Sequence, residues 1–278
     1  MLSGWLRHRL HQTPLSRTLR RIPGVSALAE RWWLISQSSA LKEAMTSLGR
    51  PVWEAPGFLP EVDLPALAQV AERDPKIVDL GDAFRAEMAT WCNTSKFQTL
   101  GYQDIYARVV AHLRSLSPRV LEVGIGVNDP TSPSGMESTH RPGASLTGWF
   151  HYFPGAEVHG ADIDRRVLVD TVEYTTHWVD QRDEQSLRNL ASTIGAPIDL
   201  IVDDGLHTPE ANGLTVMALL PYLAPHGVFV VEDILPEYDA LWLRADRWLP
   251  PDYGIAFYPG NALRGERDEG LAVLWRRA

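Results

Sequence analysis

Short apolar runs alternate with amphipathic stretches from residue 103 onward. The short runs are rich in Val, Ile and Leu and end at glycine or acidic residues, which is typical of buried strands. The stretches between them repeat apolar residues at helical spacing, so the pattern predicts strands and helices in alternation. Expected strands are 119–123, a run ending at 162, 176–179, 198–204 and 228–233, and expected helices are 80–90, 103–116, 144–152, 184–194, 209–223 and 241–249.

Such alternation is typical of an α/β protein with a parallel sheet. Two further runs, Gly254–Tyr258 and Leu271–Trp275, are joined by a polar stretch and predict a closing antiparallel pair. We therefore expect a doubly wound, Rossmann-like sheet, mostly parallel with a C-terminal antiparallel strand. This domain is expected over residues 96–278, after an N-terminal helical arm and connector over residues 1–95.

The arm differs from the rest of the chain because it is basic and carries apolar residues at helical spacing, such as Leu2, Leu6 and Leu10. It predicts a helix that packs on its own domain or on a second subunit, which favours a homo-oligomer. The alternatives are a membrane-surface helix within residues 1–35 and disorder. Arginine and histidine interrupt the apolar residues, which argues against a signal peptide. A short helix is expected over residues 64–73.

Composition narrows the possible partners. The formal charge of the 278 residues is −9, which argues against nucleic acid as a general partner. The single cysteine, Cys92, excludes an intrachain disulfide and a cysteine metal cage, and it fits a cytoplasmic protein. No apolar run approaches the ~20 residues that span a bilayer. We therefore expect a cytoplasmic protein without a transmembrane segment.

The first expected strand carries the most informative motif. It reads Arg119-Val-Leu-Glu-Val-Gly-Ile-Gly126, and the second expected strand ends at Asp162. Gly124 and Gly126 allow a sharp turn and a close approach of the backbone to a ligand. An acid at the end of the second strand is placed to bind the hydroxyls of a ribose. The stretch therefore predicts a nucleoside-binding βαβ unit.

The identity of the bound nucleoside can be narrowed further. A dinucleotide fingerprint requires a third glycine three residues after the second, and Asp129 stands there, where it would repel a pyrophosphate. Glu122, within the strand, instead suits a cationic ligand such as the sulfonium and amino group of S-adenosylmethionine (SAM). We therefore expect SAM, with a dinucleotide or an empty Rossmann-like scaffold as alternatives.

Further candidates lie at neighbouring positions. Asp180 and Gln181 follow the third strand, where a polar pair can hydrogen-bond an adenine edge, and Asp203 is assigned to the cofactor as well, unless it orients a local turn. The aromatic polar loop before the helix at 103 is expected to lie over the pocket. Lys96 and Tyr102 are therefore candidates for contact with substrate or cofactor, or ordinary surface residues.

Acidic residues also end the fourth and fifth strands. In open α/β sheets ligands gather at the carboxyl ends of the strands, and carboxylates clustered there repel one another unless a positive charge lies among them. Asp204, Glu232 and Asp233 form a hard oxygen set that suits Mg²⁺ better than Zn²⁺. His207 stands three residues after Asp204 and is the candidate general base at neutral pH.

Taken together, these motifs resemble the metal-dependent sugar O-methyltransferases of macrolide biosynthesis, the macrocin and mycinamicin type. The resemblance covers roughly residues 96–233 and implies Mg²⁺ on Asp204, Glu232 and Asp233 with His207 as the base. Ser145, in the second motif, is counted with the cofactor-binding residues. The family commonly has serine where this chain has Leu206. The motifs are Val120–Gly126, Ala144–Pro154, Gly160–Asp164, Asp180-Gln181, Ile201–His207 and Val231–Asp233.

We therefore expect an enzyme that transfers a methyl group from SAM to a sugar hydroxyl of a small molecule or oligosaccharide, with Mg²⁺ and a histidine base. One alternative is an Fe²⁺-dependent hydroxylase of the cephalosporin-hydroxylase type on the same scaffold. The other is a non-catalytic partner protein. The sequence does not identify the acceptor or the hydroxyl that is methylated.

Overall fold

The structure is a computed structural model that describes residues 75–94, 96, 101–129, 136, 140–258 and 269–277. The predicted arm, its proposed contacts with a membrane or second subunit, and the predicted helix at 64–73 lie outside the described residues. No helix in the described ranges is both long and apolar enough to cross a membrane.

Seven strands form one sheet in the order β3-β2-β1-β4-β5-β7-β6. The first five pair in parallel, β7 runs antiparallel to β5, and β6 runs antiparallel to β7. The predicted fold, including its closing antiparallel pair, is confirmed. The strands are β1 Arg119–Val123, β2 Glu157–Asp162, β3 Thr175–Trp178, β4 Ile198–Asp203, β5 Leu223–Ile234, β6 Tyr253–Tyr258 and β7 Gly270–Arg276.

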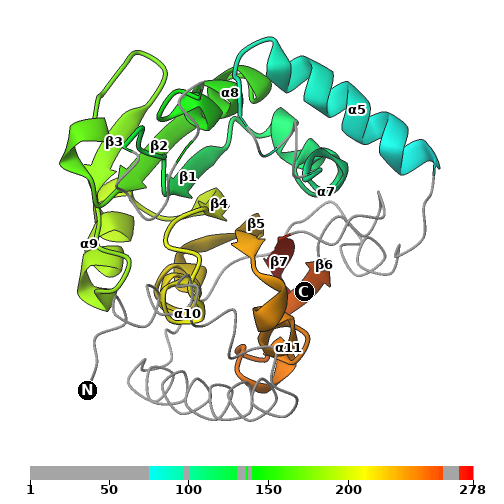
Figure 1. The fold of residues 1–278 in the computed structure, drawn as a ribbon, viewed down its shortest axis with the longest axis vertical. Coiled ribbons are helices and arrows are strands. Elements are labelled where there is room, and N and C mark those ends of the chain that lie inside the picture. Colours follow the sequence, from blue (N-terminus) through cyan, green and yellow to red (C-terminus); the bar gives the residue numbers. More distant parts are fainter. Residues whose placement is uncertain are drawn as a thin grey trace, which may run out of the picture.

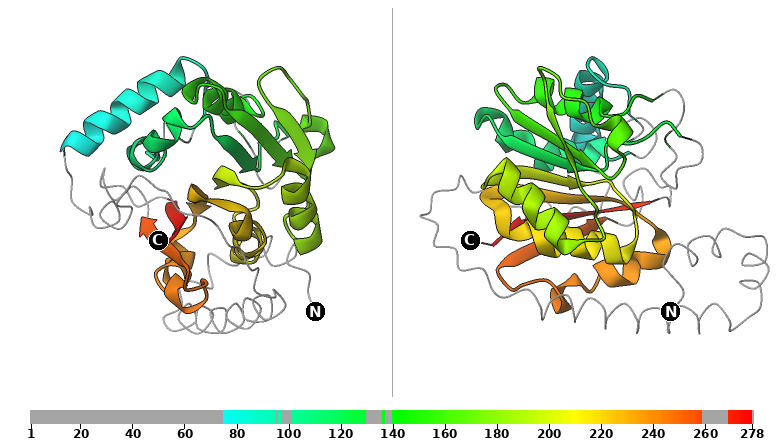
Figure 2. Two further views of the ribbon diagram at one scale, coloured as in Figure 1. Left: turned by 180° about the vertical axis from the view of Figure 1, so that it is seen from behind. Right: turned by 90° about the vertical axis from the view of Figure 1, so that its left-hand side faces the viewer.

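Helices cover both faces of the sheet (Figure 1, Figure 2). One face packs against α5 (Pro75–Ala89), α7 (Gln103–Val109) and α8 (Ala144–Tyr152), and the other packs against α9 (Glu184–Ile194), α10 (Pro209–Leu219) and α11 (Asp239–Trp242). Alternate strand residues supply the two cores, because successive side chains of a strand point to opposite faces. In β4, for example, Leu200 and Val202 join the first core and Ile201 joins the second.

Three predicted helices end earlier than expected, and the one expected over residues 209–223 is α10 followed by a 3₁₀ helix, Leu220–Tyr222. The helix expected over residues 103–116 is α7 followed by a 3₁₀ helix, Ala111–Ser115, and the helix expected over residues 241–249 is α11 followed by a 3₁₀ helix, Ala245–Arg247. Prolines at 118 and 250 close both segments soon afterwards, and a residue before proline disfavours the helical conformation. Apolar spacing alone did not distinguish one helix from two short ones.

The sheet order places a ligand site beside β1. The chain winds from β1 to β2 and β3 in one direction, then crosses to β4 and β5 on the other side of β1. The strand order therefore reverses between β1 and β4, and ligands of such sheets bind at that reversal, outside the carboxyl ends. Val123 at the end of β1 pairs with Ala161 of β2 and with Asp203 of β4, so the candidate acids lie at the same edge.

Candidate cofactor and active site

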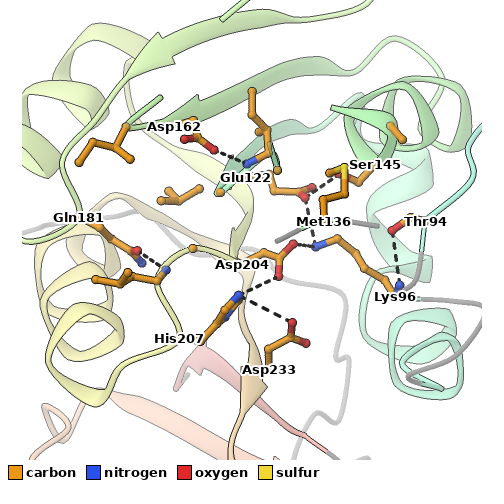
Figure 3. Close-up of a pocket in the computed structure, with 18 of the residues that line it drawn as sticks. Thr94, Lys96, Glu122, Met136, Ser145, Asp162, Gln181, Asp204, His207 and Asp233 are labelled. Atoms are coloured by element: carbon orange, nitrogen blue, oxygen red, sulfur yellow. Dashed lines mark hydrogen bonds and ion pairs between the residues drawn. The ribbon is translucent and has the colours of Figure 1, made fainter. Parts of the chain in front are cut away.

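A cavity of about 520 Å³ opens at this edge of the sheet. Most of the residues predicted for the site line it, and Figure 3 shows how their side chains lie. The predicted residues in its lining are Lys96, Glu122, Gly124, Gly126, Ser145, Asp162, Asp180, Gln181, Asp204, His207 and Asp233. Tyr102, Asp203 and Glu232 lie behind this lining, and each is buried.

The glycine turn brings β1 against the loop after β4. Gly124 has a φ of +88°, and a Cβ there would lie 2.1 Å from the carbonyl oxygen of Asp204. Any side chain at this position would therefore strain the turn and push the two strand ends apart. Gly126 also has a positive φ, +80°, and would place a Cβ against the side chain of Met136. The turn thus follows from the absence of side chains at both positions.

Asp162 is held in place at the end of β2. Its Oδ2 accepts a hydrogen bond of 3.0 Å from the backbone N–H of Ile125, and its Oδ1 accepts one of 2.8 Å from that of Asp164. The carboxylate therefore ties the glycine turn to β2 while it lines the cavity. Each oxygen has a further lone pair, so Asp162 can still accept from a ribose hydroxyl.

Glu122 is a fully buried carboxylate in the middle of β1. It accepts hydrogen bonds from Ser145 Oγ (2.6 Å) and Trp149 Nε1 (2.8 Å), both on α8, and its Oε1 lies 3.1 Å from Lys96 Nζ. Ser145, predicted as a direct cofactor contact, thus also orients Glu122. The two residues share the wall of the cavity at the start of α8.

Gln181 and Asp203 hold the loop that follows β4. The Nε2 of Gln181 donates to Asp203 Oδ1, while its Oε1 accepts from the backbone N–H of Leu206 (2.8 Å). Asp203 also accepts from Asn212 Nδ2 (3.0 Å) and does not line the cavity. The structure therefore gives Asp203 the loop-orienting arrangement that was the alternative to cofactor contact. Asp180 lines the cavity and forms an ion pair with Arg182 (2.9 Å).

Asp204, His207 and Asp233 converge on one point of the cavity (Figure 3). The Nε2 of His207 lies 4.0 Å from Asp204 Oδ1 and 3.8 Å from Asp233 Oδ2. His207 and Asp233 have φ values of +51° and +54°, in a backbone region that residues other than glycine rarely adopt. Backbone of this kind persists where surrounding contacts enforce it, commonly at functional sites.

The three residues can offer one ligand atom each to a metal ion, with those atoms within 4.8 Å of one another. Two of them, Asp204 and Asp233, belong to the predicted metal set, and the third predicted ligand, Glu232, shares Lys96 with Asp204. The set of Asp204, Glu232 and Asp233 stays a prediction. Glu232 is fully buried and accepts hydrogen bonds from Tyr106 OH and Lys96 Nζ, away from the cavity lining. The regular pairing of β5 is interrupted between Val231 and Ile234, and Asp233 has a positive φ, so its side chain lies near His207 while Glu232 stays buried.

The two predicted substrate residues are engaged inside the protein. Lys96 Nζ donates to Asp204 Oδ2 (2.6 Å) and to Glu232, and it also pairs with Glu122. An ammonium has three donors, and three carboxylates surround this one. Tyr102 donates to Asp233 Oδ1 (2.8 Å) and accepts from the backbone N–H of Asp233 (3.1 Å). Substrate contact through either side chain stays a prediction.

Burial governs the electrostatics of the cluster. Burial raises the pKa of Asp204 and of Glu232; Lys96 opposes the rise, and the neighbouring carboxylates add to it. Burial alone would lower the pKa of Lys96, but Asp204, Glu122 and Glu232 raise it well above its usual range. Lys96 thus stays charged, yet a single ammonium does not neutralise all the carboxylates around it. The site is therefore suited to a further cation.

Three supporting residues were missed from sequence. Tyr106 and Trp149 bind Glu232 and Glu122, and Asn212 binds Asp203. Tyr102 and Tyr106 are spaced i, i+4, which places two hydroxyls on one side of α7, and this spacing was a usable signal. Trp149 and Asn212 lie within predicted helices, where nothing local marks them as partners of an acid in a strand.

The fold is a Rossmann-like sheet with a cavity at its carboxyl edge, and comparison with known proteins finds methyltransferases of similar sequence and fold. Residues 135–234 match the model of a family described as "Methyltransferase domain". Among curated proteins, the demethylmacrocin O-methyltransferase of Streptomyces fradiae is 34% identical over 133 residues, or 48% of this chain and 31% of that protein. The mycinamicin VI 2''-O-methyltransferase of Micromonospora griseorubida is 31% identical over 154 residues, or 55% of this chain and 36% of that protein.

The resemblance to sugar O-methyltransferases of macrolide pathways is thereby confirmed. An 8-demethyl-8-alpha-L-rhamnosyl tetracenomycin-C 2'-O-methyltransferase of Streptomyces olivaceus is also similar, with 34% identity over 49% of this chain and 34% of that protein. The chain spans about a third of the length of these curated relatives.

Solved structures show the same fold. The methyltransferase MycE from the mycinamycin biosynthetic pathway, in complex with Mg and SAH (the demethylated form of SAM), aligns with a TM-score of 0.54 and 22% identity. The alignment covers 83% of this chain and 69% of that chain. A second MycE structure, in complex with Mg, SAH and Mycinamycin VI, aligns with a TM-score of 0.53.

Proposed function

We propose that the protein transfers a methyl group from SAM to a sugar hydroxyl, with Mg²⁺ and His207. One observation carries this proposal: a nucleoside-type turn and a cation-type cluster open into the same cavity. Gly124, Glu122 and Asp162 form the first, and Asp204, His207 and Asp233 form the second. A methyl donor held at the turn would thus lie next to an acceptor held at the cluster.

The turn supplies what a SAM molecule needs. Asp162 has free lone pairs for the ribose hydroxyls, and Gly124 and Gly126 form the sharp turn whose backbone lines the cavity beside it. Glu122 provides negative charge at the end of the cavity where the amino and sulfonium groups would lie. Asp180 and Gln181 line the cavity and remain the proposed contacts for the adenine.

The cluster fits a divalent cation. Asp204 Oδ1 and Asp233 Oδ2 are hard oxygen donors on facing strand ends, and they leave open positions for waters or substrate, as Mg²⁺ sites in enzymes usually do. When bound, the metal would lower the pKa of an acceptor hydroxyl. His207 Nε2 lies between these carboxylates, where it can accept the proton that the hydroxyl loses.

His207 is well placed for this role. Its Nδ1 is buried and has no hydrogen-bond partner among the described residues, so Nε2 is the nitrogen that faces the reacting groups. The two carboxylates lie 3.8 and 4.0 Å away, which leaves Nε2 close to both without a direct hydrogen bond to either. The base is thus oriented toward the cavity and remains free to accept a proton.

The relatives support the acceptor class. The names of several relatives describe methylation of a sugar on a macrolide or tetracenomycin, and one MycE structure contains Mycinamycin VI. We infer a glycosylated small molecule or an oligosaccharide as the acceptor of this chain. Residence in the cytoplasm and a homo-oligomeric state stay predictions.

The test is an assay of methyl transfer from labelled SAM to a panel of glycosylated macrolides, free deoxysugars and oligosaccharides. We expect labelled product with at least one acceptor, loss of the label in EDTA, and recovery with Mg²⁺. Turnover should be unchanged under anaerobic conditions, because methyl transfer consumes no O₂. Full activity in EDTA would remove the metal from the proposal, and a requirement for O₂ and Fe²⁺ would favour the hydroxylase alternative.

A further inference from the structure

Acidic side chains dominate the charged part of the cavity lining. Glu122, Asp162 and Asp180 line the cavity, and so do Asp204 and Asp233. Such a lining suits the two positive charges of SAM, which are its sulfonium and its amino group. The methionine part of SAM also carries a carboxylate, which these acids repel. A carboxylate in this cavity therefore requires a cation of its own.

Arg141 differs from the other arginine and lysine side chains in the described part of the lining. Lys96 Nζ lies 2.6 Å from Asp204 Oδ2, and Arg182 Nε lies 2.9 Å from Asp180 Oδ1. The guanidinium of Arg141 has no hydrogen bond or ion pair with any residue that the structure describes, and its side chain is exposed where it borders the cavity. Its donors are therefore free to bind an anion.

The backbone places Arg141 beside the end of the cavity where the methionine part of SAM is proposed to lie. The N–H of Gly143, two residues further on, donates to the carbonyl oxygen of Ile125 in the glycine turn (2.8 Å). Ser145, four residues further on, donates to Glu122 (2.6 Å), the acid proposed for the amino group. The amino group and the carboxylate of SAM are bonded to the same carbon atom. A cation on this wall therefore lies on the side of the cavity where that carboxylate would be.

We propose that Arg141 is the residue of this cavity that binds a carboxylate. The inference rests on the proposed function, because it presupposes SAM at the glycine turn. A guanidinium presents its donors in a planar fork that matches the two oxygens of a carboxylate. The carboxylate has two possible sources, the methionine part of SAM and an acidic acceptor sugar. The position of Arg141 beside the glycine turn favours the first.

The first experiment measures the binding of SAH and of decarboxylated SAH, which keeps the amino group, by calorimetry. We expect Arg141→Met to weaken SAH by about ten-fold and to change the affinity for the decarboxylated analogue by less than about two-fold, because only SAH offers the carboxylate. Arg141→Lys keeps the charge without the fork and should recover part of the affinity for SAH.

Arg114→Met is the matched control. Arg114 forms an ion pair with Glu87 outside the cavity lining, so this variant changes the net charge equally and should leave both affinities unchanged. Equal losses for SAH and its analogue in Arg141→Met would overturn the proposal. Absence of SAH binding to the wild-type protein would instead overturn the proposed function, and the inference with it.

The second experiment tests the other source of the carboxylate if Arg141→Met binds SAH as tightly as the wild-type protein does. Glucuronate and glucose, which differ at one carboxylate, are titrated into the SAH complexes of both proteins. Binding of glucuronate alone to the wild-type complex, with a loss of about ten-fold in Arg141→Met, would assign Arg141 to an acceptor carboxylate. No difference between the two complexes would overturn the proposal.

Discussion

Two pairs of acids end neighbouring strands, and the pairs are built alike. In Asp203-Asp204 at β4 and in Glu232-Asp233 at β5, the first residue is fully buried and the second is partly exposed toward the cavity. Asp203 is held by Gln181 and Asn212, as Glu232 is held by Tyr106 and Lys96. The second residues, Asp204 and Asp233, instead face His207.

The difference within each pair arises where the regular strand stops. Asp203 is the last residue of β4 and Asp204 follows it in the loop, and Asp233 has a positive φ where the pairing of β5 is irregular, so the second acid of each pair reaches the cavity. The other is buried and must be paired, because an unpaired buried carboxylate is strongly destabilising. The comparison teaches that a doublet of acids at a strand end combines one residue that supports the structure with one that is available for chemistry.

The largest expected effect is the loss of turnover when His207, rather than one of the acids around it, is replaced. In His207→Ala we expect kcat for methyl transfer to fall by about 10²–10⁴-fold, because the general base is lost. Binding of SAH by calorimetry should stay near the wild-type value, since the proposed cofactor residues Glu122 and Asp162 make no hydrogen bond to His207. A variant that keeps full turnover would show that another group accepts the proton.

Matched substitutions of Asp203 and Asp204 compare how much each acid contributes to stability. Asp203→Asn places an amide group against Gln181 and Asn212, which both donate to the native carboxylate, so we expect a loss of about 1–3 kcal/mol in the free energy of unfolding. Asp204→Asn should lose less stability, because the amide oxygen can still accept from Lys96 Nζ and the repulsion from Asp233 is removed. Urea denaturation of both variants measures the difference.

Binding of Mn²⁺ should show the opposite order. Asp204 lines the cavity with His207 and Asp233, and Asp203 does not line it, so Asp204→Asn should weaken Mn²⁺ binding while Asp203→Asn leaves it close to wild type once the variant is folded. If Asp203→Asn lost cation affinity without losing stability, the division of the pair into one supporting and one reacting acid would be wrong.

The sequence predicted the parts of this arrangement that local pattern encodes. Periodicity located the strands, and acids at strand ends marked Asp162, Asp204 and Asp233 as residues of one edge. Lys96 could not be identified from sequence as the partner of Asp204 and Glu232, because it is 108 residues from Asp204 and 136 from Glu232 along the chain. A metal was therefore expected to balance all the charges, whereas the protein supplies part of that balance itself.

The different surroundings of Glu232 and Asp233 were also not predicted from sequence. Sequence reasoning treated the doublet as one ligand set because it did not assign each side chain to a face of the sheet. The backbone of Asp233 has a positive φ, so the regular alternation changes at that residue. Neither its conformation nor its hydrogen bonds to Tyr102 can be inferred from the residue types.

The smallest expected effects come from the two tyrosines of α7. Tyr102 donates to Asp233, which lines the cavity, and Tyr106 donates to Glu232, which is buried behind it. Tyr102→Phe should weaken Mn²⁺ by about ten-fold, because it removes a hydrogen bond that orients a metal ligand. Tyr106→Phe should leave Mn²⁺ affinity unchanged and lower the free energy of unfolding by about 1 kcal/mol.

The same substitution at the two tyrosines thus compares Asp233 with Glu232, since both variants lose only a hydroxyl and both tyrosines are buried. Calorimetry with Mn²⁺ and urea denaturation on each variant give the two readouts. Equal effects of the two substitutions on Mn²⁺ would mean that Asp233 and Glu232 act as one unit. If only Tyr102→Phe weakens Mn²⁺ binding, the hydrogen bond to Asp233 affects the cation and the one to Glu232, which also binds Lys96, does not.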